Sequence, residues 1–247
     1  MDANNNGDAM RRKRDASVEL TRVAGCLIVI GCHTALQYTN SNHWDVSRLF
    51  IACLFADGVA VFFMLTGFFL YDANAYGYIV RRSFHKVFVP MLVFSAAAFY
   101  LVPFLSGSLG LRNALLRPWT DYANAIKSFL AWSNWAPGQG HLWYVYVYMM
   151  LMLAWPAVKG IVDFVDSSDG NRRAFMAATL FLLAVNDYTC NGLFAFAHHS
   201  INGVVPAAIV SVWGHILYLH RSESEKVPAA AYVALLLGLN LLRMWIQ

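Results

Sequence analysis

Charged residues are scarce in this chain, and their scarcity is uneven. They make up 13% of the 247 residues, about half the share that a soluble domain carries on its wetted surface. Residues 142–158 and 227–242 contain no Asp, Glu, Lys or Arg. Runs of this kind approach the ~20 residues that a helix needs to cross a ~30 Å hydrocarbon core. The composition therefore excludes a soluble globule and predicts an integral membrane protein.

The few cysteines and the small net charge exclude other classes of function. The four cysteines lie in or beside apolar runs, without the spacing of zinc or thioredoxin motifs. His198 and His199 are adjacent but have no carboxylate partner, so we predict no metal site. A net charge of +4 is no nucleic-acid signature. We expect the lipid bilayer, not nucleic acid, as the surrounding partner.

The apolar segments predict an all-α fold, a polytopic transmembrane bundle of about seven spanning helices. The segments are residues 18–38, 48–71, 87–105, 141–164, 174–188, 201–220 and 227–246. Residues 122–135 have apolar residues at helical spacing but are too short to span, which predicts an interfacial or re-entrant helix. Residues 1–14 are predicted to be a disordered basic tail, and residues 15–247 a single transmembrane domain.

Lysine and arginine are distributed unequally between the two sets of loops. Twelve fall in the tail and in the loops that share its side, and four fall in the opposite loops. Because cytoplasmic loops carry the excess of positive charge, we predict a multi-pass protein of the cell membrane with a cytoplasmic amino terminus.

The first apolar segment contains ionisable residues, which are costly in a membrane and so are functional candidates. Arg22 and His33 are 11 residues apart, which places them on nearly the same helix face, roughly 16 Å apart along the axis. Glu19 lies three residues before Arg22 and is positioned to pair with it. We expect this stripe to line a polar cavity. A purely structural role in helix packing stays open on these residues alone.

Two further blocks carry polar groups at the ends of apolar segments. Asp57 precedes Gly58, which together with Gly67 permits close helix approach. Asp57 is a candidate partner for Arg22 or another cation, and a role as the cap of a broken helix stays open. His141 and Trp143 open the fourth segment at the predicted outer interface. An aromatic belt accounts for Trp143, whereas His141 is a candidate for the entrance of an acceptor.

A compact cationic cluster precedes Pro90. It consists of Arg81, Arg82 and Lys86, on the predicted cytoplasmic side. Topology alone accounts for its charge. Several cations close together also suit the phosphates of a nucleotide-bearing donor, and both interpretations stay open.

In this order, the four blocks resemble the integral-membrane acyltransferase-3 family, which modifies cell-surface glycans and related acceptors. Arg22 and His33 match an Arg and a His with ten residues between them. Residues 58–68 are similar to a Gly-Val-x-x-Phe-Phe-x-x-Ser/Thr-Gly-Phe pattern, followed by a basic stretch ending in Pro90 and a His-x-Trp-Tyr block at 141–144.

The resemblance, which covers residues 15–160, implies a membrane O-acyltransferase, most simply an O-acetyltransferase. Its donor would be cytoplasmic acetyl-CoA or another acyl-CoA, with no permanently bound cofactor. Its acceptor would be a hydroxyl of an envelope glycan or a lipid-linked sugar. His33 would be the catalytic base and Arg22 a donor-orienting cation. The implied donor-binding residues are Arg81, Arg82 and Lys86, and the implied substrate-binding residues are Glu19, Asp57, His141 and Trp143.

Two other functions stay open. A proton-coupled carrier would use the same Arg, His and Asp residues as a relay, although the sequence shows no internal repeat. The family has more spanning helices than the seven expected here. The chain would then be a shortened member, a fragment without the carboxy-terminal helices, or a non-catalytic remnant.

Overall fold

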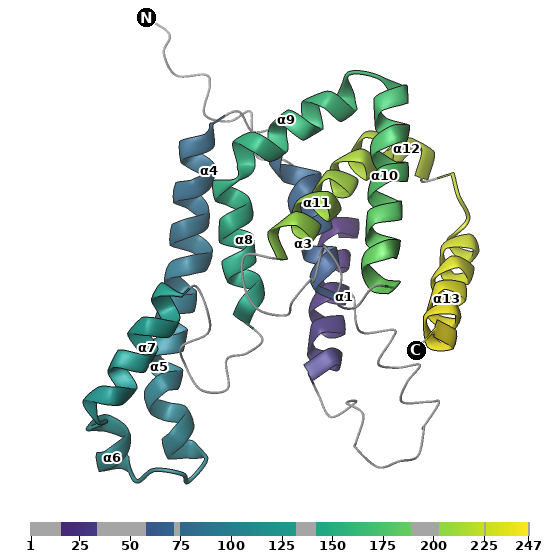
Figure 1. The fold of residues 1–247 in the computed structure, drawn as a ribbon. Helices are drawn as coiled ribbons and strands as arrows, with labels where there is room; N and C mark the ends of the chain where they lie inside the picture. The colour runs from purple at the N-terminus through teal and green to yellow at the C-terminus, as the bar shows by residue number, and fades with distance from the viewer. Residues whose placement is uncertain are drawn as a thin grey trace, which may run out of the picture. The chain divides into compact units, whose positions relative to one another are not determined.

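The computed structural model describes residues 16–33, 58–71, 75–131, 142–188, 203–224 and 226–246. Throughout these ranges every regular element is a helix (Figure 1), which confirms the predicted all-α class. The tail at 1–14 lies outside them. The helices are α1 (Ala16–His33), α3 (Gly58–Leu70), α4 (Tyr76–Ser83), η1 (Phe84–Phe88), α5 (Val89–Leu105), α6 (Leu111–Leu115), α7 (Trp119–Leu130), α8 (Trp143–Leu153), α9 (Trp155–Asp166), α10 (Asp169–Tyr188), α11 (Val204–Leu219), α12 (Arg221–Ser224) and α13 (Ala229–Ile246).

Helices α4, η1 and α5 run on as one helix of 30 residues, Tyr76–Leu105. At ~1.5 Å per residue it is ~45 Å long, which exceeds the hydrocarbon core. Among the described residues it is the one unbroken helix long and apolar enough to cross a membrane. The π-helical turn η1 lies just before Pro90, whose missing N–H interrupts the α-helical hydrogen bonding.

The fourth predicted segment is not one straight helix. Helices α8 and α9 are bent by 69° at their junction, where Ala154 separates them. Pro156, the second residue of α9, has no N–H to donate to the carbonyl of Met152, so the helix breaks there. The pair is apolar enough for a broken span or a re-entrant segment, while α3, α11 and residues 230–239 are shorter apolar helices. The count of seven spans stays a prediction.

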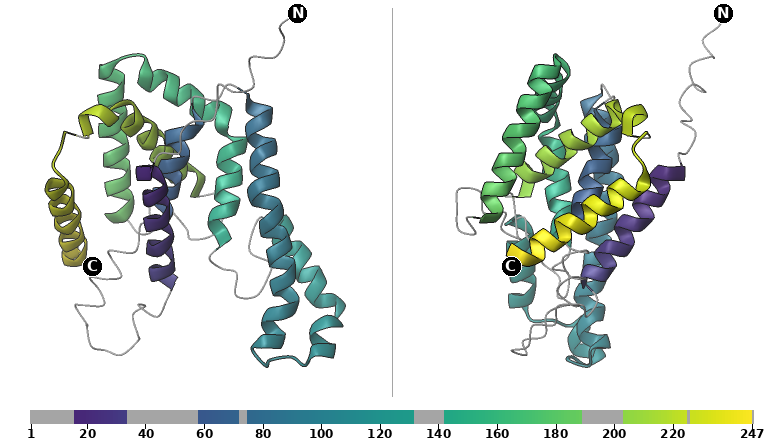
Figure 2. Two further views of the ribbon diagram at one scale, coloured as in Figure 1. Left: turned by 180° about the vertical axis from the view of Figure 1, so that it is seen from behind. Right: turned by 90° about the vertical axis from the view of Figure 1, so that its right-hand side faces the viewer.

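The chain divides into two compact units, and residues 66–221 form the larger one. In it, α8 contacts α4, η1 and α11, and α9 contacts α10 and α11 (Figure 2). The centre is almost wholly apolar. Its most deeply buried side chains are Val147, Leu151, Met152, Val162, Val165 and Val212, with Ser211 as a polar exception.

The smaller unit contains residues 1–65 and 222–247. Its α1 and the start of α3 approach closely, because a Cβ added at Gly58 would lie 2.8 Å from the Ile28 side chain and 3.0 Å from the Val29 backbone nitrogen. This agrees with the predicted role of Gly58. Large apolar side chains of α1 and α13 are exposed, among them Leu20, Leu27 and Leu235.

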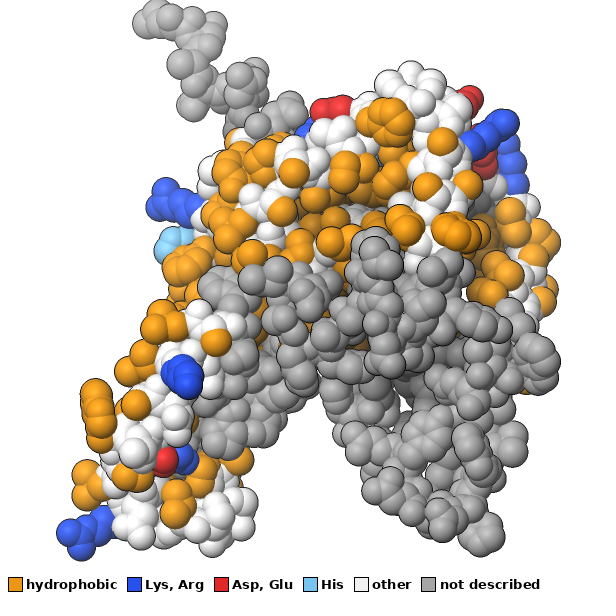
Figure 3. Space-filling model, viewed as in Figure 1, with side chains coloured by type: hydrophobic (Ala, Val, Ile, Leu, Met, Phe, Trp, Pro, Cys, Tyr) orange, Lys and Arg blue, Asp and Glu red, His pale blue; other side chains and the backbone are white. Residues whose placement is uncertain are grey.

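Apolar side chains also cover much of the described surface in Figure 3, where Lys and Arg are few. In the larger unit, Val93 and Phe94 of α5 and Phe181 of α10 are more than half exposed. Extended apolar surface of this kind marks a region that contacts lipid or another protein. It is consistent with the predicted membrane location.

Candidate functional site

The first predicted contact of the site is present in α1. Arg22 Nη1 donates to Glu19 Oε1 at 2.8 Å, and both side chains are about half exposed. Helix α1 runs without a break from Ala16 to His33, the condition under which Arg22 and His33 share a face. The side chain of His33 lies outside the description, so its orientation and catalytic role stay predictions.

The cationic cluster lies where α4 passes into η1. Arg81 and Arg82 occupy the last turn of α4 and Lys86 lies in η1, and all three are exposed. Arg82 Nη1 donates to the Tyr78 hydroxyl at 3.5 Å, with its guanidinium 5.9 Å from the centre of the Tyr78 ring. Arg82 and Lys86 are four residues apart on one continuous helix, so their charges stand together where an anionic ligand has access.

The predicted acceptor side is described only in part. Trp143 begins α8 and is half-buried, and a Cβ added at Gly203 would lie 3.7 Å from its ring. Trp143 thus lies next to the start of α11. Asp57 and His141, like His198 and His199, lie outside the described residues, and their predicted roles stay untested.

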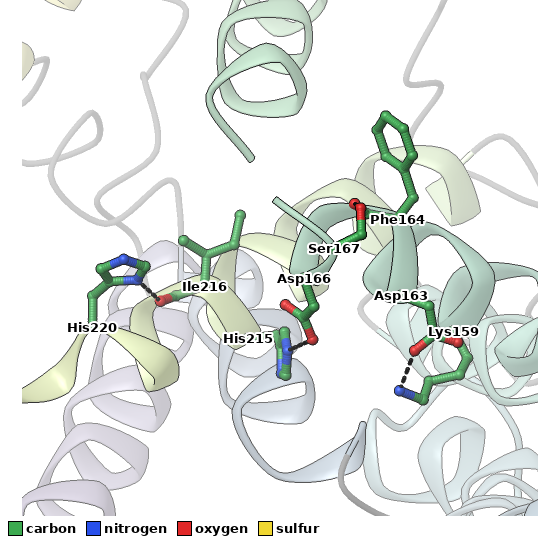
Figure 4. Close-up of polar contacts among 8 residues, drawn as sticks. All are labelled: Lys159, Asp163, Phe164, Asp166, Ser167, His215, Ile216 and His220. Carbon is green, nitrogen blue, oxygen red and sulfur yellow. Dashed lines mark hydrogen bonds and ion pairs between the residues drawn. The ribbon is translucent and has the colours of Figure 1, made fainter. Parts of the chain in front are cut away.

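The structure brings together a buried polar cluster that the sequence reasoning missed. His215 of α11 places Nε2 3.0 Å from Asp166 Oδ2 at the end of α9 (Figure 4). The His215 side chain is 5% exposed and the Asp166 side chain 35% exposed. A carboxylate acceptor at this distance fixes the Nε2–H tautomer of the imidazole. The cluster therefore reaches from the surface at Asp166 into the interior at His215.

Two hydroxyl groups extend the same cluster. The hydroxyls of Tyr71 and Ser211 are 2.6 Å apart, and Ser211 donates its proton to the Ala208 carbonyl at 2.8 Å. Because a serine has a single hydroxyl proton, Tyr71 is the donor to Ser211. The Tyr71 ring meets the His215 ring edge-on at 5.7 Å between centroids. The end of α3 is thus attached to α11 by polar and aromatic contacts.

One turn further along the chain, His220 forms a second histidine contact. Its Nδ1 lies 3.0 Å from the Ile216 carbonyl (Figure 4), and its Nε2 lies 3.1 Å from Arg172 Nη1. A carbonyl only accepts, so Nδ1 carries the proton and Nε2 accepts from the guanidinium. Arg172 also pairs with Asp169 at 3.0 Å. The end of α11 is therefore anchored to the start of α10.

These contacts gather ionisable groups at one end of the larger unit. At the other end of α9, Tyr76 at the start of α4 donates to the Leu153 carbonyl at 3.0 Å and stacks on Trp155. The charge distribution predicts that the end with the ionisable groups is cytoplasmic. A signal for His215 was present, since a histidine in an apolar segment is a functional candidate. Nothing in the sequence indicated Asp166 as its partner.

A metal centre finds no support in the described ranges, where no three His, Cys, Asp or Glu side chains are grouped to hold an ion.

The comparison with known families covers nearly the whole chain. A family model described as an acyltransferase domain, that of the acyltransferase-3 family, matches residues 15–246. No curated protein and no solved structure matches the chain.

Proposed function

Because this chain belongs to the acyltransferase-3 family, we propose that it is a membrane O-acyltransferase that moves an acyl group, in the simplest case acetyl, from cytoplasmic acyl-CoA to a hydroxyl. The acceptor in this proposal is an envelope glycan or a lipid-linked sugar. The family match over residues 15–246 carries the proposal. The unbroken α1, which holds Arg22 and His33 on one helix, supports the placement of the chemistry.

In the proposed reaction His33 accepts the proton of the acceptor hydroxyl. The oxygen attacks the thioester carbonyl carbon, a C–O bond forms, and the C–S bond breaks. The imidazolium then returns the proton to the leaving thiolate. Imidazole suits both steps because its ordinary pKa lies near neutrality, ~6.5. Arg22, oriented by Glu19 at 2.8 Å, would contact and orient the donor at its thioester or its phosphates.

The donor side of the proposal uses the exposed Arg81, Arg82 and Lys86. Three phosphate groups of coenzyme A need several cations, and a helix that presents them on successive turns suits that need. Asp57, His141 and Trp143 would contact the acceptor.

The decisive experiment is the transfer of radiolabelled acetyl from acetyl-CoA in membranes that contain the chain. We expect wild-type protein to label the glycan or lipid fraction, and His33→Ala to lose about 10²–10⁴-fold in rate. His85→Ala, an exposed histidine of η1, is the matched control and should retain activity. Equal labelling by wild type and His33→Ala in the inserted protein would refute the mechanism.

One observation favours a second candidate, a proton-coupled carrier. The 69° break between α8 and α9 is of the kind that transporters use at their binding sites. Proteoliposomes decide between the two. Solute flux without acyl-CoA favours the carrier, and label transfer without flux favours the enzyme.

A further inference from the structure

Arg117 occupies an unusual position in the hairpin formed by α5, α6 and α7. It lies in the short link between α6 and α7, directly before Pro118, the N-cap of α7. Its side chain is only 7% exposed, and its guanidinium carbon lies 4.1 Å from the centre of the Phe99 ring of α5. The hairpin thus buries a full positive charge against an aromatic face.

The hydrogen bonds of Arg117 within the described chain leave two of its three guanidinium nitrogens without a partner. Nη1 donates to Asp121 Oδ2 at 3.3 Å, a long contact to a partly exposed carboxylate. Nε and Nη2 are buried and, over the described chain, have no hydrogen-bond partner. Leaving buried donors unpaired is costly, and more so when they are charged. We call the edge of the guanidinium formed by Nε and Nη2 the fork. An unpaired fork in an otherwise ordered hairpin points to a missing acceptor.

No neighbouring group replaces that acceptor. The nearby Tyr122 hydroxyl is no counter-anion, because the hydrogen bond with Tyr100 raises the pKa of Tyr122 above its ordinary value and the phenol stays neutral at physiological pH. Asp121 reaches Nη1 alone. Asp121 therefore balances the charge of Arg117, but the buried N–H groups of Nε and Nη2 remain without an acceptor.

The chemistry of the missing acceptor follows from the shape of the fork. Nε and Nη2 form the edge of an arginine that binds two oxygens of one phosphate or carboxylate side by side. The amino terminus of α7, a helix of 12 residues, begins two residues further on and has no side-chain cap. A helix amino terminus also favours an anion. Two independent features thus select an anionic oxygen ligand.

The surroundings of the fork select a lipid anion over a soluble one. Leu115, Leu116 and Trp119 flank Arg117 in the sequence, and all three are more than half exposed. Exposed apolar residues with a tryptophan among them are typical of a segment at the headgroup level of a bilayer. The sequence also predicts an interfacial helix here. The anions found at that level are the phosphates of lipids.

We propose that Arg117 and the amino terminus of α7 bind the phosphate group of a membrane lipid. The phosphate accepts from Nε and Nη2 while Nη1 keeps its contact with Asp121. Because both nitrogens are covered by the hairpin, the guanidinium turns outward as the lipid enters. Two lipids offer this group, a bilayer phospholipid and a phosphate-linked acceptor. The second source alone rests on the proposed function.

Binding is tested on the full chain in detergent, without acyl-CoA, so that it is measured independently of acyl transfer. The probes are dihexanoyl phosphatidic acid and the matching diacylglycerol, which differ by the phosphate. The readout is the ligand dependence of thermal unfolding. We expect phosphatidic acid to raise the Tm and the diacylglycerol to leave it unchanged. Arg117→Lys keeps the charge but loses the fork, and we expect about tenfold weaker binding.

Arg112→Gln is the matched control, because Arg112 is an exposed arginine of α6 and its loss changes the net charge without touching the fork. It should bind phosphatidic acid like wild type. An isoprenyl phosphate that outcompetes phosphatidic acid tenfold supports the site and assigns it to a lipid-linked acceptor. If the isoprenyl phosphate and phosphatidic acid compete equally, the result also supports the site and assigns it to a bilayer phospholipid.

Equal stabilisation of the wild type by phosphatidic acid and diacylglycerol would overturn the proposal, as would unchanged binding in a folded Arg117→Lys. Inorganic phosphate binding as tightly as phosphatidic acid would also overturn it, because the lipid would then play no part. The comparison of ligands on the wild type decides the question even where an Arg117 variant does not fold.

Discussion

The imidazole of His215 and the carboxylate of Asp166 lie 3.0 Å apart although 49 residues separate them in the chain. The contact joins the end of α9 to the carboxy-terminal third of α11. The buried core of the larger unit is otherwise mainly apolar, so the polar pair gives direction to a packing arrangement that hydrophobic contact alone would leave free to slide. It is thus a natural place to test how the larger unit holds together.

Removing the charge of Asp166 should destabilise the protein. In Asp166→Asn the amide oxygen still accepts from His215, but the charge-assisted contact is lost. We expect a cost of about 1–2 kcal/mol, since one third of the Asp166 side chain is exposed. Thermal unfolding in detergent measures it.

The control is Asp163→Asn in the same helix. Asp163 pairs with Lys159 at 2.6 Å on the surface (Figure 4), and an exposed i,i+4 pair contributes only about 0.3–0.5 kcal/mol. If the two variants lost the same stability, the buried contact would have no special value.

Adding one methyl group at Gly67 should prevent normal folding. A Cβ there would overlap the backbone carbonyl of Ser211 in α11, and a backbone carbonyl has no rotamer by which to move away. We expect Gly67→Ala to abolish or severely reduce the folded fraction. Size-exclusion chromatography of the detergent-extracted protein gives that fraction.

Gly160→Ala in α9 provides the contrast, because nothing lies within 4 Å of a Cβ at that position. There the better helix propensity of alanine should stabilise by up to about 1 kcal/mol. A Gly67→Ala variant as stable as Gly160→Ala would show that α3 and α11 are not in close contact.

Neutralising the cationic cluster should weaken binding of the donor. In the double variant Arg82→Gln with Lys86→Gln, two exposed charges on adjacent turns are lost. We expect the KM for acetyl-CoA to rise about tenfold or more with little change in kcat, because charge-assisted contacts to phosphate bind the donor without taking part in the reaction. Steady-state acetyl transfer measures both constants.

The matching control carries Arg112→Gln with Lys127→Gln, which removes the same charge from α6 and α7 on the predicted opposite side. Its KM should equal that of the wild type. A rise of equal size in both double variants would mean that net charge, not the cluster, attracts the donor.

Local features could be predicted from the sequence. The helical class follows from the long uncharged runs, and the Arg22–Glu19 pair follows from its three-residue spacing, which any helix brings into contact. Pro156 would also have located the break between α8 and α9, since a proline cannot continue the hydrogen bonding of the preceding turn. The length of the apolar run concealed that signal.

Contacts between distant segments could not be predicted from the sequence. His215 could have packed against any helix, and Asp166 reads as one of several acidic residues at a helix end. The same holds for Arg117, whose burial against Phe99 depends on the turn that folds α6 and α7 back along α5. Such contacts arise from tertiary packing, which periodicity and composition do not specify.

The contact between Gly67 and Ser211 has a mechanical consequence. Two helices that meet backbone to backbone cannot separate by a change of side-chain rotamer, and the neighbouring Tyr71–Ser211 hydrogen bond of 2.6 Å limits their rotation. The crossing of α3 and α11 is therefore a fixed contact within the larger unit. A rearrangement of the larger unit that keeps this backbone contact would have to turn the neighbouring segments about it.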